Sequence, residues 1–280
     1  EGMFRGAASF NQWISRWDVS RVTSMRDMFQ HAVLFNDGYV DANGTGFGLA
    51  YLQGVMTQWD VSRVTNMQGM FHGALAFNRD VSTWDVSRVT NMQDMFHGAV
   101  AFSQDVSLWR VSAVTNMRGM FKDVPHFNQD LSLWDVSRVT NMESMFHGAA
   151  AFNSALDKWN VINVKNMNRT FHKSISFNQD VRRWDVRNVL TIDNMFSGAS
   201  SFQQDISRWN VRFVRDSASV FTNTGMGPQE YCGEWHRVVS LAGQLGPVST
   251  SDTCSNCVCP NGVPVDECTS TNGTNCVECD

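Results

Sequence analysis

The stretch Trp84-Asp-Val-Ser-Arg-Val-Thr-Asn-Met92 recurs, with drift, along most of the chain. Its tryptophans are 25 residues apart without slippage, at Trp59, Trp84, Trp109, Trp134, Trp159, Trp184 and Trp209. Trp17 is an eighth copy, which lies 42 residues before Trp59 because one period there carries 17 extra residues. A fixed period of this length is typical of a solenoid, in which equivalent residues of successive coils lie in columns.

One repeat, residues 84–108, predicts a short strand followed by a single helical turn. Its Val-Ser-Arg-Val-Thr segment is rich in β-branched and cap-forming residues, which interrupt a long helix. We expect a strand at 89–92, a helical turn through Met95 and Phe96, and a left-handed exit at Gly98. The same glycine recurs at Gly73, Gly148 and Gly198. Two-helix repeats need more than about 30 residues and strand-plus-turn coils about 20–29, so the period favours an α/β solenoid of leucine-rich-repeat-like coils.

The columns of such a solenoid become ladders, since adjacent coils lie about 4.8 Å apart. We expect the tryptophan column to be a buried aromatic ladder with methionines filling gaps beside it; an exposed row that stacks on sugar rings is the alternative. An asparagine column is expected to be a structural ladder, in which side-chain amides bond to one another. It consists of Asn66, Asn91, Asn116, Asn141 and Asn166.

Several charged or polar columns are candidates for function. Aspartates at the position of Asp85 should repel one another, so they need donors or a cation. The expected donors are backbone amides of the turn and the arginines three positions on, at Arg21, Arg63, Arg88 and Arg138. Calcium is the weaker alternative because the calcium-binding β-roll pattern is absent, so we predict no metal and no cofactor.

Two further columns each allow an ordinary structural interpretation and a functional one. A histidine column, at His72, His97, His147 and His172, is expected to be solvated; metal chelation and a pH switch are the alternatives. A threonine row, at Thr65, Thr90, Thr115 and Thr140, resembles the face of an ice-binding solenoid only weakly. We therefore assign no site to either column.

Cysteine usage divides the chain into two parts. Residues 1–231 contain no cysteine, and all seven follow: Cys232, Cys254, Cys257, Cys259, Cys268, Cys276 and Cys279. Such density is typical of a small extracellular module held by disulfides; a four-cysteine zinc site is the alternative. We predict a solenoid of about eight coils at 1–221, with an insertion near 37–53, and a disulfide-rich tail at 222–280.

Charge and sequons support a secreted chain. The repeats carry 21 basic and 20 acidic residues, and the tail carries one basic and seven acidic residues. This balance disfavours nucleic acid and anionic membranes as partners. Glycosylation sequons occur at Asn43, Asn168 and Asn272. The sequence begins inside a repeat, so we expect a processed or excerpted product, and no run is apolar enough for a membrane span.

The repeat Phe-Asn-Gln-Asp-Val-Ser-x-Trp-Asp-Val-Ser-x-Val-Thr-Asn-Met-x-x-Met-Phe resembles that of BspA-like leucine-rich-repeat surface proteins, and the match covers residues 3–221. The resemblance implies a right-handed solenoid on a cell surface, a role in adhesion or matrix, and no catalytic residues. The segment 257–262, Cys-Val-Cys-Pro-Asn-Gly, resembles small cysteine-rich modules that recur in protist surface proteins.

No phosphate loop, catalytic triad or His-Glu-x-x-His motif is present, so we predict that the chain is not an enzyme. The leading hypothesis is a non-catalytic extracellular structural or adhesive protein of a cell-surface or filamentous assembly. Its expected partners are other copies of itself or other surface and matrix proteins. The alternative is a recognition module that binds glycan or protein through its strand face and the 37–53 loop.

Overall fold

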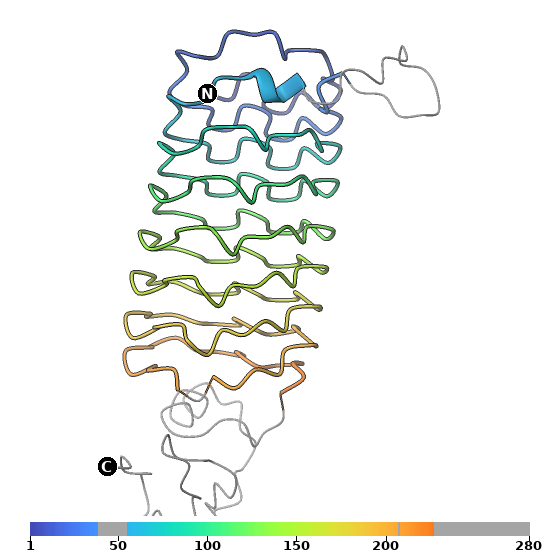
Figure 1. Ribbon diagram of the computed structural model, residues 1–280. Helices are drawn as coiled ribbons and strands as arrows, with labels where there is room; N and C mark the ends of the chain where they lie inside the picture. Colours follow the sequence, from blue (N-terminus) through green and yellow to red (C-terminus); the bar gives the residue numbers. More distant parts are fainter. Residues whose placement is uncertain (39–54, 207, 227–280) are drawn as a thin grey trace, which may run out of the picture.

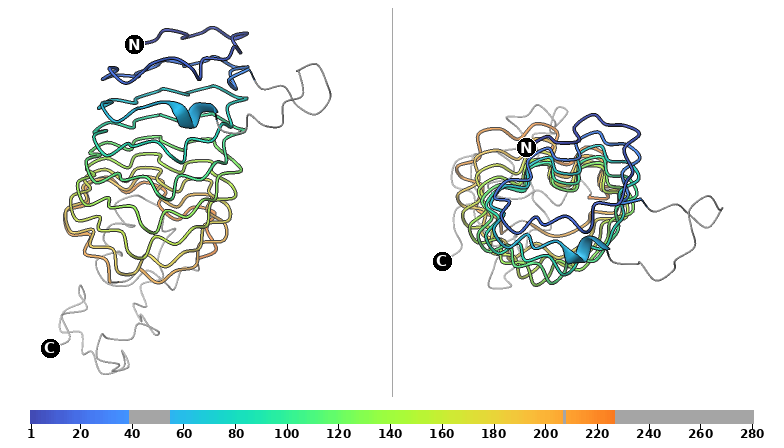
Figure 2. Two further views of the ribbon diagram at one scale, coloured as in Figure 1. Left: turned by 45° about the horizontal axis from the view of Figure 1, so that its top comes forward. Right: turned by 90° about the horizontal axis from the view of Figure 1, so that it is seen from above.

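The computed structural model describes residues 1–38, 55–206 and 208–226, which form one stack of coils wound about a common axis (Figure 1). The predicted repeat solenoid is therefore confirmed. Near the end of the first described segment lies Asp37, a buried residue whose Oδ1 accepts a hydrogen bond from the backbone N–H of Ile14 at 3.0 Å. The next described segment begins with the 3-10 helix η1, Val55–Gln58. Seen along the axis, successive coils are slightly offset, so the stack is twisted (Figure 2).

The predicted strand and helical turn in each coil were wrong. In the described coils, regular pairing is reduced to one isolated parallel bridge per coil, for example between Asn66 and Asn91. No α-helix occurs in the part of the chain that the structure describes. Short turns replace both elements: Met95 N–H donates to the Met92 carbonyl (3.2 Å), and the same three-residue step recurs around the coil.

Hydrogen bonds between coils alternate with these turns along the backbone. The N–H of Met92 donates to the Asn116 carbonyl of the next coil at 3.0 Å, and alternate residues as far as Gly98 repeat this bond. The N–H of Thr90 donates in the opposite direction, to the Thr65 carbonyl of the previous coil at 2.9 Å. Because every second residue is engaged in a turn, backbone groups are satisfied without a continuous strand.

Two positions in the left-handed region, four residues apart, recur in each coil. The predicted exit at Gly98 is confirmed, with φ of 68°, and Gly73, Gly148 and Gly198 share it. The second position, Asp94 with φ of 53°, was not predicted from the sequence. Its column holds Asp27, Gly69, Asp94, Gly119, Ser144, Arg169, Asn194 and Ser219. A positive φ at the third residue is characteristic of a type II turn. Because this column holds residues of several types, glycine does not mark the position in the sequence.

The two glycines Gly73 and Gly98 make a matched test of the left-handed exit. Gly98→Ala should lower the free energy of unfolding by about 1 kcal/mol, because an L-residue resists positive φ and the new Cβ meets nothing closer than 3.9 Å. Gly73→Ala should cost more, because its Cβ would lie 2.4 Å from Nδ1 of His31. Chemical denaturation measures both; equal losses would contradict the close approach of the His31 ring to Gly73.

The tryptophan column lies in the core, as predicted. The rings of Trp84 and Trp109 stack with centroids 6.5 Å apart and planes 3° apart. Each indole also links coils through a hydrogen bond: Nε1 of Trp109 donates to the Val81 carbonyl at 3.0 Å. Equivalent bonds are made by Trp59, Trp84, Trp134, Trp159, Trp184 and Trp209. The alternative of an exposed, sugar-stacking row is thus wrong for these seven residues.

Two phenylalanine columns run beside the tryptophans. Within a coil, Phe96 stacks on Phe102 at 3.9 Å, and Phe96 also stacks on Phe121 of the next coil at 5.7 Å. The pattern continues from Phe29 to Phe221, and methionines such as Met92 fill the space between. The interior is therefore a continuous aromatic stack, in which every coil depends on its neighbours for burial.

The first coils depart from this pattern. Trp17, the eighth tryptophan of the repeat, is 41% exposed and lies beside Phe4 at 5.7 Å. Trp13 is 59% exposed. Neither residue has the buried environment of the later tryptophans.

Candidate functional site

The asparagine ladder lies along the line of parallel bridges. Oδ1 of Asn91 accepts the backbone N–H of Gln93 at 3.0 Å, and its Nδ2 donates to Oε1 of Gln68 in the previous coil at 3.2 Å. The same turn hydrogen bond is accepted by Asn66, Asn116, Asn141 and Asn166. The asparagine amides thus bond to the backbone and to glutamine or glutamate side chains of the previous coil, whereas no hydrogen bond joins two asparagines of this column among the described residues.

A second asparagine ladder, not predicted from the sequence, lies at the Phe-Asn-Gln segment of the repeat. Oδ1 of Asn78 accepts the backbone N–H of Ser103 in the next coil at 3.0 Å, and Oδ1 of Asn153 accepts that of Asn178 at 2.9 Å. Asn11, Asn36, Asn128 and Asn178 accept in the same way. The asparagine that directly follows Phe35, Phe77, Phe127, Phe152 and Phe177 was the signal for this ladder.

The aspartate column caps turns. Oδ1 of Asp85 accepts the backbone N–H of Ser87 at 3.1 Å, and hydrogen bonds from Ser87 hold the pKa of this carboxyl below its ordinary value. The expected ion pairs with arginines three positions on are not formed among the described residues; Arg187 instead pairs with Asp185, two positions away, at 2.8 Å. Within the described ranges, no group of three histidine, cysteine or acidic side chains could hold a metal ion.

Hydroxyls of the threonine row are engaged within the stack. Oγ1 of Thr90 donates to the Thr65 carbonyl at 3.1 Å, and Thr115 and Thr140 repeat the bond. The row therefore reinforces the contact between coils.

The histidine column departs most from expectation. The rings of His72 and His97 stack 4.3 Å apart, and only 21% of the His97 side chain is exposed, so the prediction of a solvated position was wrong. His97 Nδ1 lies 3.6 Å from Oδ1 of Asp94, and its Nε2 lies 3.6 Å from Oδ2 of Asp123. His147 Nε2 lies 4.0 Å from the other oxygen of Asp123.

Burial makes three imidazoles of this column, those of His72, His147 and His172, weaker bases. It lowers the pKa of His72 to about 4, and the neighbouring His97 and His31 add to the effect. Burial, with His172 as the next cause, likewise lowers the pKa of His147 to about 4. The pKa of His172 is also lowered, again chiefly by burial. At neutral pH the rings of His72 and His147 are therefore uncharged, and a base of this strength removes protons poorly.

A polar groove of about 330 Å³ surrounds these rings. It is lined by both signs of charge, including Arg118 and Glu143, which lie 3.4 Å apart, and by Lys122. The buried Nδ1 atoms of His147 and His172 have no hydrogen-bond partner among the described residues. The groove thus combines imidazoles with the ion pair of Arg118 and Glu143, and it is lined by the second left-handed column at Asp94, Gly119, Ser144 and Arg169.

Asn168 is the one predicted glycosylation site within the described residues. Its Oδ1 accepts the backbone N–H of Asp193 at 2.8 Å, and the sequon hydroxyl of Thr170 is buried and donates to the Met167 carbonyl at 2.8 Å. A glycan would therefore have to be attached before this coil folds. The other predicted sites lie outside the described residues: Asn43, Asn272, Cys232, Cys254, Cys257, Cys259, Cys268, Cys276 and Cys279.

These features define a repeat solenoid, in which polar columns reinforce the stack. No helix of the described residues is long and apolar enough to cross a membrane. The family model described as "Mycoplasma protein of unknown function, DUF285" matches residues 1–45, 43–141 and 125–235, and the chain belongs to this family. The resemblance drawn from the repeat is thus supported at the level of a repeat family.

Comparison with solved structures gives a match to a leucine-rich repeat protein from Bacteroides ovatus ATCC 8483. The two are 11% identical, the match covers 49% of this chain and 45% of that one, and the TM-score is 0.28. Such a distant likeness carries no argument about function. No curated protein matches the chain.

Proposed function

We propose that the chain is a non-catalytic structural or adhesive protein of the cell surface, whose solenoid serves as a stiff rod in a larger assembly. The observation that carries this proposal is the aromatic stack, which continues from Phe29 to Phe221. Each ring is held by the coils on both sides, so bending would separate many contacts at once.

The polar columns support the same proposal. Asparagine, aspartate and threonine side chains bond to the backbone of their own or an adjacent coil, as at Asn91, Asp85 and Thr90. Repeated polar side chains are thus used to hold coils together. An extracellular location rests on the family resemblance and on the cysteine content of the tail.

A recognition module remains the alternative function, and the polar groove beside His97 is the observation that favours it. The expected contribution of the 37–53 loop concerns residues that are largely outside the described part of the chain. Glycan or protein would then bind to a single rod without any need for assembly.

Light scattering of the secreted full chain across a hundredfold concentration range tests the proposal. We expect particles heavier than one chain whose mass rises with concentration. A chain that stays monomeric throughout, and that binds an immobilised glycan saturably, would contradict a role in a larger assembly and establish the alternative.

A further inference from the structure

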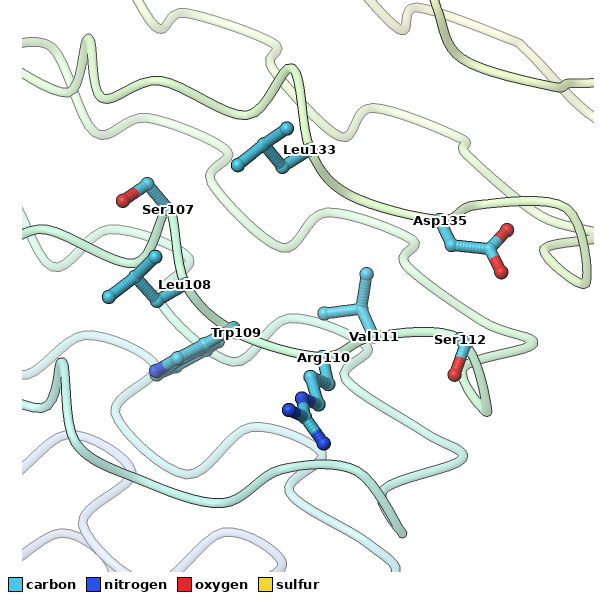
Figure 3. A pocket seen from close by; sticks show the side chains of 8 residues that line it. All are labelled: Ser107, Leu108, Trp109, Arg110, Val111, Ser112, Leu133 and Asp135. Atoms are coloured by element: carbon cyan, nitrogen blue, oxygen red, sulfur yellow. The ribbon is translucent and has the colours of Figure 1, made fainter.

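The polar column that directly precedes the tryptophans is interrupted on two adjacent coils, those that contain Trp109 and Trp134. Leu108 and Leu133 are 74% and 71% exposed, and they are the most exposed large apolar side chains of the described residues. They flank a shallow groove of about 310 Å³ (Figure 3). In other coils this column is polar: Arg16, Gln58, Thr83, Lys158, Arg183 and Arg208.

The charge pattern changes at the same place. Two positions after Leu108, the aspartate column is interrupted by Arg110, whereas the next coil keeps Asp135 (Figure 3). Arg110 helps to lower the pKa of Asp85 in the previous coil without forming a salt bridge to it, and Oδ1 of Asp135 accepts the backbone N–H of Ser137 at 3.0 Å. Two exposed leucines therefore lie beside one cation and one anion, in matching columns of neighbouring coils.

We propose that this patch, Leu108, Arg110, Leu133 and Asp135, is a docking surface for a second copy of the chain in antiparallel orientation. A twofold axis between the two coils, perpendicular to the solenoid axis, exchanges one coil for the other. It places Leu108 opposite Leu133 of the second copy and Arg110 opposite Asp135 of the second copy, each twice. The patch is thus complementary to itself, as an isologous interface requires.

A parallel arrangement does not have this complementarity. An axis along the solenoid would place Arg110 opposite Arg110 and Asp135 opposite Asp135, and like charges in contact oppose association. Because Arg110 carries a positive charge in a column of aspartates, the antiparallel arrangement is favoured over the parallel one.

The flanking coils fit the antiparallel register as well. Thr83 and Asp85 would face Lys158 and Asn160 of the second copy, which brings a cation close to an anion. One further coil out, Asp60 would face Asp185, but Asp185 is already paired with Arg187 at 2.8 Å. Four leucines alone bury too little area for a stable dimer, so these flanks are needed to approach the roughly 1,200 Å² of a specific interface.

This inference rests on the proposed structural function and identifies one contact through which rods would associate laterally. Sedimentation equilibrium of the full chain tests it. The fractions used are those that show no covalent dimer on non-reducing gels. Arg110→Asp or Asp135→Arg alone should each weaken the dimer at least tenfold, because each places like charges together twice.

Rescue makes the test specific to the register. The double variant Arg110→Asp/Asp135→Arg should restore the wild-type dissociation constant, because each new charge then faces its opposite. An equimolar mixture of the two single variants should also form dimers. Ile175→Asp, a change at another exposed apolar residue, serves as the matched control and should leave dimerisation unchanged.

The outcomes separate this contact from the proposed function. If wild-type chains assemble but the single charge changes leave the dissociation constant unchanged, or the double variant fails to recover, the antiparallel contact is wrong and the structural role stands. If wild-type chains stay monomeric at every concentration, both are overturned. Circular dichroism and thermal melting show that each variant is folded.

Discussion

Trp134→Ala should lower the free energy of unfolding by about 4 kcal/mol, the range found when a large aromatic side chain is removed from a core. The ring is 3% exposed, lies 6.2 Å from Phe121, and donates from Nε1 to the Val106 carbonyl at 3.0 Å. Removing it leaves a cavity and deprives that carbonyl of one of its two donors, since the backbone N–H of Trp109 also donates to it at 3.1 Å. Denaturant unfolding followed by far-ultraviolet circular dichroism measures the loss.

Two companion variants show which part of the side chain matters. Trp134→Phe keeps an aromatic ring in the stack but loses the N–H, so we expect a loss of about 2 kcal/mol. Trp13→Ala removes a ring that is 59% exposed, and we expect a change below about 1 kcal/mol. Equal losses at Trp13 and Trp134 would contradict a core built on the buried tryptophans.

Acidification from pH 6.5 to pH 4 should destabilise the solenoid through the histidine column. His72 and His147 have folded-state pKa values of about 4, below the ordinary value of 6.5. The unfolded chain therefore binds protons first as the pH falls, and stability that is complete above pH 6.5 is lost toward pH 4. The groups that act on the two rings are His31, His97, Asp27, Asp94, His172, Asp123, Lys122 and Lys173.

Each ring should contribute about 1–2 kcal/mol over this range, because the full shift corresponds to about 3 kcal/mol and solvent screens the partly exposed rings. The double variant His72→Gln/His147→Gln removes both titrations and should show a flatter curve between pH 6.5 and pH 4.5. Stability measured by urea denaturation at half-unit pH steps makes the comparison. Identical curves for wild type and double variant would exclude this role for the histidines.

The sequence was sufficient to predict the solenoid, its columns and its buried tryptophans, because a strict 25-residue period places every copy in the same environment. It was also sufficient for the left-handed exit, because Gly98 and its equivalents mark a position that favours glycine. Periodicity and glycine are local signals, and neither depends on knowing how the coils pack.

Periodicity and glycine could not distinguish strands and helical turns from consecutive short turns. Apolar residues recur about every three positions in the repeat, and each of these backbones places such residues inward. The second left-handed position holds residues as different as Asp94 and Arg169, so it carries no residue preference. Burial of His97 depends on contacts with Asp94 and with Asp123 of the next coil, which only the register of adjacent coils defines.

The most direct test of the proposed structural role is cryo-electron microscopy of the unreduced full chain, at a resolution that shows contacts between chains. We predict rods of stacked coils that associate through repeated contacts, with antiparallel pairs joined at Leu108 and Leu133. Isolated rods without any recurring contact, each with a ligand in the groove beside His97, would contradict a structural role.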